Sequence, residues 1–178
     1  MDRIDVRLLG PEKTAFHRSE PPSAFGLESE PGFEFPITLD VTARMAGTRV
    51  SVEGTVGCTV RLECSRCLEP FDTALNAEVL VEFEEGSLPE VGEDEVRDEE
   101  PDVSWYTAPF IDLRDDVRQI LLVATPPYPV CREDCKGLCP ECGLNRNTTA
   151  CGHGGGDGKL RPFATLGILL EKEHEGHG

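Results

Sequence analysis

The chain has 178 residues, a formal net charge of −17 and a sequence pI of about 4.5. This length suits one domain, or one domain with a small appendage, and it is long enough for an apolar core. The charge argues against a general phosphate-binding surface and favours a basic protein partner. No apolar run approaches the roughly 18 residues of a membrane span, and the start of the chain has no apolar signal core. We therefore expect a cytoplasmic protein that does not contact a membrane.

The N-terminal part is predicted to contribute little regular structure. Residues 3–9 have the alternation of an edge strand. Residues 10–32 are rich in proline and are predicted to be irregular.

Residues 33–85 are predicted to form an antiparallel meander. Apolar and polar residues alternate here, for example from Val50 to Leu62, and Thr and Val are frequent. Gly47 and Gly54 are predicted to mark turns or bulges. Such a sheet needs a cover on one face. The expected fold class is therefore α+β: an antiparallel meander or barrel-like sheet covered by a helix.

Residues 82–102 hold eleven acidic residues and one basic residue. Like charges at this density repel one another, which favours a solvated acidic loop. The alternative interpretation is an acidic arm that binds a basic partner.

Residues 111–124 are predicted to form the covering helix. Asp112 can cap it, and Pro126 and Pro127 end it. One apolar stripe follows the helical period, which favours packing on the sheet over a partner-binding helix. The stripe consists of Leu113, Val117, Ile120, Leu121 and Ala124.

Seven of the eight cysteines fall in two clusters. In a compartment that keeps thiols reduced, clustered cysteines indicate metal binding or redox chemistry rather than disulfides. The first cluster is Cys64-x2-Cys67. The second is Cys131-x3-Cys135-x3-Cys139-x2-Cys142, followed by Cys151-x-His153.

The second cluster predicts one structural zinc site, because two residues between cysteines let both sulfurs reach one ion. Gly143 relieves the backbone after the second cysteine of such a pair. Two ligand sets remain open. One is Cys131, Cys135, Cys139 and Cys142, although its internal linker, residues 136–138, is short. The other is Cys139, Cys142, Cys151 and His153. In a less favoured alternative, Cys64 and Cys67 join the second cluster.

The chain is therefore expected to have two parts. Residues 1–125 form the β-rich domain with its covering helix. Residues 126–178 form the cysteine-rich zinc-hook segment, which ends in a Gly-rich stretch and a short helix from Pro162.

Other chemistry fits the sequence less well. The spacing Cys135-x3-Cys139-x2-Cys142 also occurs in radical enzymes that use an iron–sulfur cluster, but those need a large barrel. A redox dithiol at Cys64 and Cys67 needs a helix N-terminus after a strand, and the flanks here are meander strands. No phosphate loop, GxSxG or HExxH motif is present. We expect no catalytic residues, no enzyme activity and no small-molecule substrate.

Several motifs together resemble the YceD-type family of large ribosomal RNA subunit accumulation proteins. They are "DVRLLG" near the start, "CSRCLEPF", "LVATPPYPVC" and "CREDCKGLCPECGLNRN". The first cysteine motif of the family maps to Cys64, Arg66, Cys67, Leu68, Glu69 and Pro70. The second maps to Cys131, Cys135, Gly137, Leu138, Cys139, Cys142, Gly143 and Asn145.

The chain also departs from this family. Many relatives end the second motif in Cys-x-Cys, where this chain has Cys151 and His153, a change that keeps a metal ligand. The following "GKLRPFATL" also differs. Some relatives lack these cysteines, so the shared function of the family does not require metal.

The resemblance implies a non-catalytic role in large-subunit ribosomal RNA accumulation and ribosome assembly. With the acidic charge, it predicts binding to a basic ribosomal protein or a pre-ribosomal particle. One alternative is a zinc module that contacts rRNA directly through Arg66, Arg132, Lys136 and Arg146. Another is a thiol redox protein.

Overall fold

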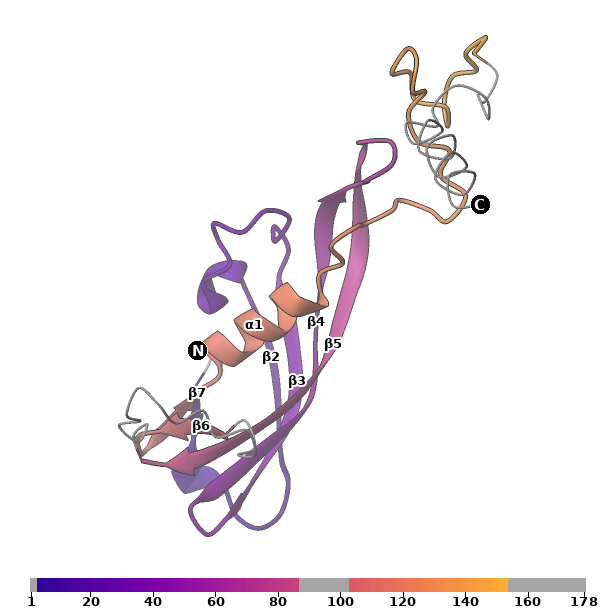
Figure 1. The fold of residues 1–178 in the computed structure, drawn as a ribbon. Helices are drawn as coiled ribbons and strands as arrows, with labels where there is room; N and C mark the ends of the chain where they lie inside the picture. Colours follow the sequence, from indigo (N-terminus) through magenta and orange to yellow (C-terminus); the bar gives the residue numbers. More distant parts are fainter. Residues whose placement is uncertain (1–2, 87–102, 154–178) are drawn as a thin grey trace, which may run out of the picture. The chain divides into compact units, whose positions relative to one another are not determined.

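The computed structural model describes residues 3–86 and 103–153, and this part of the chain is mostly β-sheet with one α-helix. Five strands form one sheet in the order β2-β3-β4-β5-β6, and two form a small sheet, β1-β7 (Figure 1). The elements are β1 (Arg3–Asp5), η1 (Val6–Leu8), β2 (Thr14–Glu20), η2 (Pro22–Phe25), β3 (Ile37–Ala46), β4 (Arg49–Glu63), β5 (Pro70–Glu85), β6 (Val103–Tyr106), β7 (Phe110–Asp112) and α1 (Arg114–Ala124).

The predicted meander is confirmed, since β2 to β5 each pair antiparallel with the next strand along the chain. The barrel-like alternative is wrong. β6 adds to β5 in parallel, and the sheet stays open with β2 and β6 at its two edges. β5 extends to Glu85, so residues 82–85, which were predicted to begin the acidic loop, belong to this strand. Residues 87–102 and the short helix predicted from Pro162 lie outside the described residues.

Residues 10–32 contain a strand, β2, where an irregular segment was predicted. β2 is an edge strand whose side chains are mostly exposed, so its sequence lacks the apolar alternation that identifies a half-buried strand. The N-terminal strand is shorter than predicted. β1 ends at Asp5 and pairs with β7 rather than with the main sheet.

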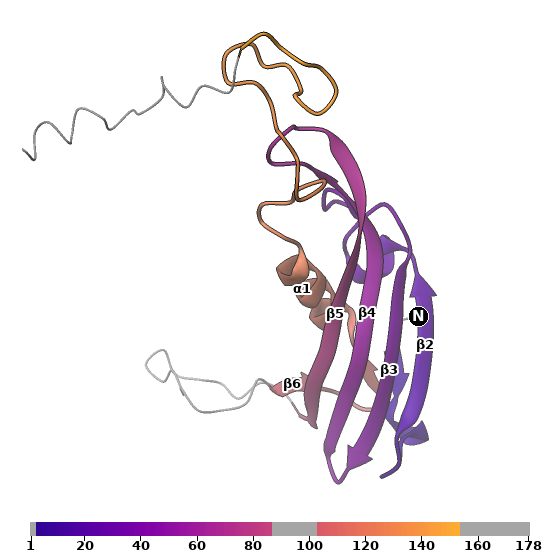
Figure 2. The ribbon, with the colours of Figure 1, turned by 90° about the vertical axis from the view of Figure 1, so that its right-hand side faces the viewer.

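The helix is confirmed, but it begins at Arg114 rather than at residue 111, because residues 110–112 form β7. Asp112 still serves the helix start, where its carboxylate accepts from the Arg114 N–H at 3.1 Å. The predicted stripe faces the core, with Val117 and Leu121 fully buried. α1 lies across one face of the curved sheet (Figure 2).

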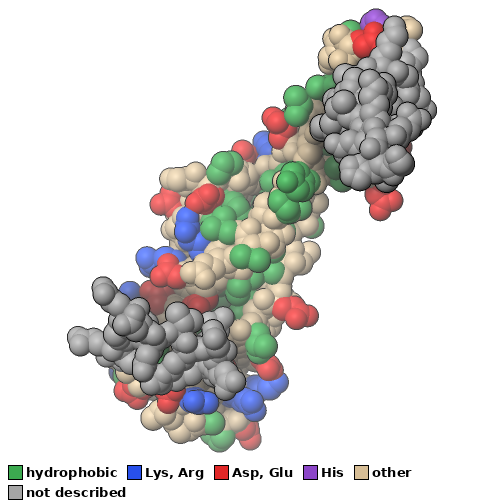
Figure 3. Space-filling model, viewed as in Figure 1, with side chains coloured by type: hydrophobic (Ala, Val, Ile, Leu, Met, Phe, Trp, Pro, Cys, Tyr) green, Lys and Arg blue, Asp and Glu red, His purple; other side chains and the backbone are tan. Residues whose placement is uncertain are grey.

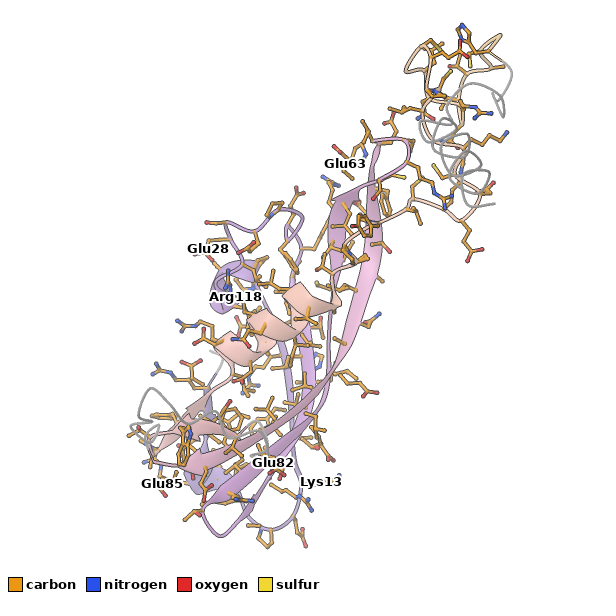
Figure 4. All side chains as sticks on the ribbon, in the orientation of Figure 1. Lys13, Glu28, Glu63, Glu82, Glu85 and Arg118 are labelled. Carbon is orange, nitrogen blue, oxygen red and sulfur yellow. The ribbon has the colours of Figure 1, made fainter. Side chains whose placement is uncertain are left out.

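Arg118 fastens α1 to the segment after η2. Its Nε donates to the Gly26 carbonyl at 3.2 Å, and its guanidinium pairs with Glu30. Figure 4 shows Arg118 reaching from the helix toward this segment. Helix and η2 thus close one side of the core, whose largest fully buried side chains include Phe25, Leu27, Ile37, Phe83, Ile111, Leu113 and Leu121.

The β4–β5 hairpin is longer than its neighbours. β4 pairs with β5 along its whole length, whereas β3 pairs with β4 only as far as Gly57. Gly54 lies inside β4 and is not a turn. Its backbone passes so close to β3 that an added Cβ would meet the Asp40 carbonyl oxygen at 2.1 Å. Glycine there permits the long strand that ends at Glu63, one residue before Cys64.

The chain divides into two compact units. The first contains Met1–Cys64 and Glu69–Cys131, and the second contains Ser65–Leu68 and the chain from Arg132 onward. In its described residues the second unit consists of turns and one isolated bridge, Leu138 to Asn145. No helix in the described part of the chain is long and apolar enough to cross a membrane.

Candidate metal centre

The structure sorts the candidate ligands into two groups of four. In each group, one ligand atom per residue lies within 4.8 Å of the other three. The first, called the CSRC group, is Cys64, Cys67, Cys131 and Cys135. The second, called the CPEC group, is Cys139, Cys142, Cys151 and His153. None of these cysteines is in a disulfide.

The short linker of residues 136–138 explains this sorting. Cys135 and Cys139 belong to different groups, so the structure does not gather Cys131, Cys135, Cys139 and Cys142 around one point. Instead, Cys131 and Cys135 come together with Cys64 and Cys67. The alternative set with Cys151 and His153 forms the CPEC group as a unit.

The first cysteine pair lies in the loop that joins β4 to β5. Cys64 donates its N–H to the Glu69 carbonyl at 3.0 Å, which closes this loop across its base. Leu68 takes a left-handed conformation with φ of 58° and is exposed. Both Cys64 and Cys67 are buried. The loop is thus held in a strained form that turns its sulfurs inward.

Arg66 ties this loop to the second cysteine pair. Its Nη1 donates to the Glu133 carbonyl at 3.0 Å and to the Cys135 carbonyl at 3.2 Å. Its own carbonyl accepts from the Leu138 N–H at 3.0 Å. Gly137 packs against it, because an added Cβ would lie 2.8 Å from the Arg66 oxygen. Side chain and backbone of one residue therefore position the segment that carries Cys135.

Asn147 donates to a sulfur of the CSRC group. Its Nδ2 lies 3.3 Å from Cys135 Sγ, and its Oδ1 accepts from the Lys136 N–H at 2.8 Å. Asn145 holds this side chain in turn, accepting from Asn147 Nδ2 at 2.9 Å. An N–H donor on a cysteine sulfur stabilises the thiolate, which is the form that binds metal.

The CPEC group is built on a tight turn. Gly143 donates to the Cys139 carbonyl at 2.9 Å, and Cys139 donates to the Leu144 carbonyl at 2.8 Å. Gly143 makes this possible with φ of 71°. Backbone N–H donors from Cys142 and Glu141, together with side-chain contacts from Cys142 and Cys151, lower the pKa of Cys139 to about 6. The turn therefore favours the thiolate.

His153 completes this group through Nδ1, which lies 4.0 Å from Cys139 Sγ. Its other ring nitrogen, Nε2, lies 3.8 Å from a carboxylate oxygen of Glu141. This is an ion-pair contact rather than a hydrogen bond, and it places a carboxylate on the side of the ring where metal-binding imidazoles commonly have one. The substitution of His for the second cysteine of Cys-x-Cys is thus accompanied by a fitting neighbour.

Either group can hold a metal ion. Sulfurs around a tetrahedral zinc lie about 3.8 Å apart, given a Zn–S distance of about 2.3 Å. Ligand atoms within 4.8 Å therefore need only a small contraction to bind. Thiolate and imidazole are soft ligands that favour zinc over magnesium or calcium. The eighth cysteine, Cys58, belongs to neither group and is half-buried in β4.

Two supporting residues were missed from the sequence. Neither Glu141 nor Asn147 stood out, although both lie within a few residues of predicted ligands. A polar residue next to a metal motif has many other uses, and only the fold shows which atom it meets. The pattern Asn145-x-Asn147 after the cysteine turn is the signal that was available.

These features define a β-sheet protein that carries two cysteine-rich groups, each of which could hold a metal ion. The family model described as large ribosomal RNA subunit accumulation protein YceD matches residues 52–170, which include both groups. The chain belongs to this family, as its motifs predicted.

Curated relatives agree with this assignment. An uncharacterized protein of Mycobacterium tuberculosis is 33% identical over 108 residues, covering 61% of this chain and 50% of the relative. A large ribosomal RNA subunit accumulation protein YCED homolog 1, chloroplastic, is 28% identical in Zea mays (64% and 46% covered) and 24% identical in Arabidopsis thaliana (80% and 51% covered). The chain thus spans about half the length of these relatives. No solved structure matches it.

Proposed function

We propose that this protein is a non-catalytic, cytoplasmic factor that supports accumulation of large-subunit ribosomal RNA and ribosome assembly. The observation that carries the proposal is family membership over residues 52–170, together with the names of the plant relatives as large ribosomal RNA subunit accumulation proteins. The described residues are compatible with a binding role, because seven of the cysteines and His153 lie in two groups that could each hold a metal ion.

Zinc is the metal proposed for both groups, in a structural role. The support is the donor set of seven thiols and one imidazole, with Asn147 on Cys135 and Glu141 behind His153. Closed four-ligand sites leave no open position for a reacting water, so such zinc stabilises the fold without supplying chemistry.

The proposed partner is a basic ribosomal protein, free or in a pre-ribosomal particle. A chain of charge −17 attracts basic surfaces and is repelled by free RNA. Two arginines proposed for direct RNA contact already have internal partners. Arg66 binds backbone carbonyls, and Arg132 pairs with Asp134 at 3.3 Å. Protein binding is therefore favoured over an RNA-binding zinc module.

A thiol redox role has less support. Attack on a disulfide needs an accessible thiolate. Cys64 and Cys67 have exposed fractions of 0% and 3%, and Cys139, whose pKa is lowered, has 4%.

The test uses cells that lack the protein. Complementation with the wild-type chain is expected to restore the ratio of large- to small-subunit rRNA, and the protein is expected to co-sediment with large-subunit precursors. The Cys139→Ser variant is expected to complement poorly, because this chain folds less stably without its zinc, whereas Cys58→Ser, which alters the cysteine outside both groups, should complement fully. A normal rRNA ratio without the protein would refute the function. Failure of Cys58→Ser alone would refute the assignment of metal ligands.

A further inference from the structure

β5 has one edge that is only partly paired. Its edge toward β4 is paired from Pro70 to Glu84, whereas β6 covers the other edge only from Glu82 to Glu85. In the described chain, no backbone hydrogen bond outside the regular elements reaches residues 70–81. Along residues 70–81, here called the free edge of β5, the N–H and C=O groups that point away from β4 therefore have no backbone partner among the described residues. Such an edge accepts an added strand.

A hollow of about 270 Å³ opens where the free edge meets β6. It is called the Asp116 hollow, and its lining includes Leu80 and Val81 of β5, Ser104 of β6, and Asp116, Gln119 and Ile120 of α1. The hollow combines an apolar wall with one carboxylate. A side chain with an apolar stem and a charged end, such as Lys or Arg, matches that combination.

Asp116 lacks a cationic partner in the described chain. The Ser104 hydroxyl donates to it at 3.0 Å, and the charges that act on it are the like charges of Asp112 and Asp115. Burial is the main reason why its pKa is raised above the ordinary value. A carboxylate in this position gains most from a cation supplied by another molecule.

The strand itself is acidic. β5 contains five acidic residues and no basic residue. Asp72 and Glu84 pair with arginines of β4, but Glu78 and Glu82 have no basic partner among the described residues. Figure 4 shows Glu82 and Glu85 at the end of β5 that β6 covers, and Figure 3 shows hydrophobic side chains spread over the face where α1 lies.

We propose that the free edge of β5 and the Asp116 hollow bind an extended basic segment of a partner protein as an added strand, with a Lys or Arg side chain beside Asp116. The proposal rests on the proposed function for the class of partner. A second copy would bring one acidic edge against another. Residues 87–102 of the chain itself hold eight acidic residues and one basic residue, so charge opposes them as occupants as well.

The first test uses a synthetic peptide of alternating Lys and Val and the isotope-labelled full chain. Two further peptides carry N-methyl groups on every Lys or on every Val, which removes the donors of one strand edge and leaves the charge unchanged. Strand addition predicts that one methylated peptide binds about tenfold more weakly and the other binds normally. It also predicts slower exchange in the complex of those amides of residues 71–81 that point away from β4. Equal affinity of all three peptides would overturn the proposal.

The second test compares two neighbouring carboxylates. Asp116→Asn removes the charge in the hollow, and Asp115→Asn removes an exposed charge that does not line it. We expect Asp116→Asn to weaken binding of the unmethylated peptide about tenfold and Asp115→Asn to change it less than twofold. Equal losses would show that only overall charge matters, which contradicts the proposal. Slow exchange in the free chain of those amides of residues 71–81 that point away from β4 would contradict it too, because that edge would already be filled.

These results are separable from the proposed function. If the wild-type chain co-sediments with large-subunit precursors but the peptide binds Asp116→Asn as tightly as the wild type, only the edge proposal fails. If the peptide adds as a strand but the chain does not co-sediment and rRNA levels are normal, only the proposed function fails.

Discussion

Two glycines lie in the turns that carry the cysteines of the CSRC and CPEC groups. Replacing each by alanine tests the backbone geometry of those turns quantitatively. Gly143 and Gly137 both have positive φ, 71° and 66°. Alanine in this region costs about 1–2 kcal/mol. Around Gly143 an added Cβ meets nothing within 4 Å, so Gly143→Ala carries only this conformational cost. Since 1.4 kcal/mol is a factor of ten, zinc affinity of the CPEC group should fall about 5- to 30-fold.

Gly137→Ala should lower zinc affinity more than Gly143→Ala does. Its Cβ would lie 2.8 Å from the Arg66 carbonyl oxygen, a distance that real Cβ atoms essentially never show. That oxygen also accepts from Leu138, so the loop carrying Cys67 must move. With steric cost added to the conformational cost, the loss should be on the order of 100-fold or more, and it should reach both groups.

The assay is competition with a chromophoric zinc chelator, using anaerobically purified full-length chains. Gly152→Ala is the matched control, because Gly152 lies between two ligands of the CPEC group but has an ordinary φ and open space around its Cα. Its affinity should equal that of the wild type. Wild-type affinity in Gly137→Ala, or a larger loss in Gly143→Ala than in Gly137→Ala, would refute the derived geometry.

Three further predictions concern single side chains. Leu68→Asn should raise the free energy of unfolding by about 1 kcal/mol in urea titrations, because asparagine tolerates the left-handed φ of 58° better than leucine; unchanged or lower stability would contradict this. Cys58→Ser should leave zinc content unchanged by mass spectrometry, whereas Cys139→Ser should lose one ion; the reverse order would refute the ligand assignment. Asp116→Asn should be more stable than the wild type at neutral pH, with Trp105 fluorescence as the probe. Because burial raises the pKa of folded Asp116, its ionisation penalises the fold as pH rises above the ordinary value of 3.8. The advantage should vanish below that pH, and an advantage independent of pH would contradict the reasoning.

Much of the fold could be predicted because its signals are local. The stripe from Leu113 to Ala124 has the helical period, and the alternation from Val50 to Leu62 has the period of a strand with one buried face. β2 was missed because an exposed edge strand needs no apolar alternation. The start of the helix was displaced because Ile111 is buried in β7, and a buried apolar residue fits either period.

The ligand types could be predicted from the sequence, but their grouping depends on contacts between distant segments. Nothing local indicates that Arg66 donates to the carbonyls of Glu133 and Cys135 across more than sixty residues of chain. Those bonds bring the first cysteine motif to the second. The CPEC group was accessible as one alternative because all four of its ligands fall between residues 139 and 153.

Metal content of the full-length chain tests the central claim most directly. Native mass spectrometry after anaerobic purification is expected to show two zinc ions in the wild type, one in Cys67→Ser and one in Cys142→Ser, since each variant removes one ligand from a different group. A wild-type chain without bound metal would contradict the account. So would a single ion lost equally in both variants.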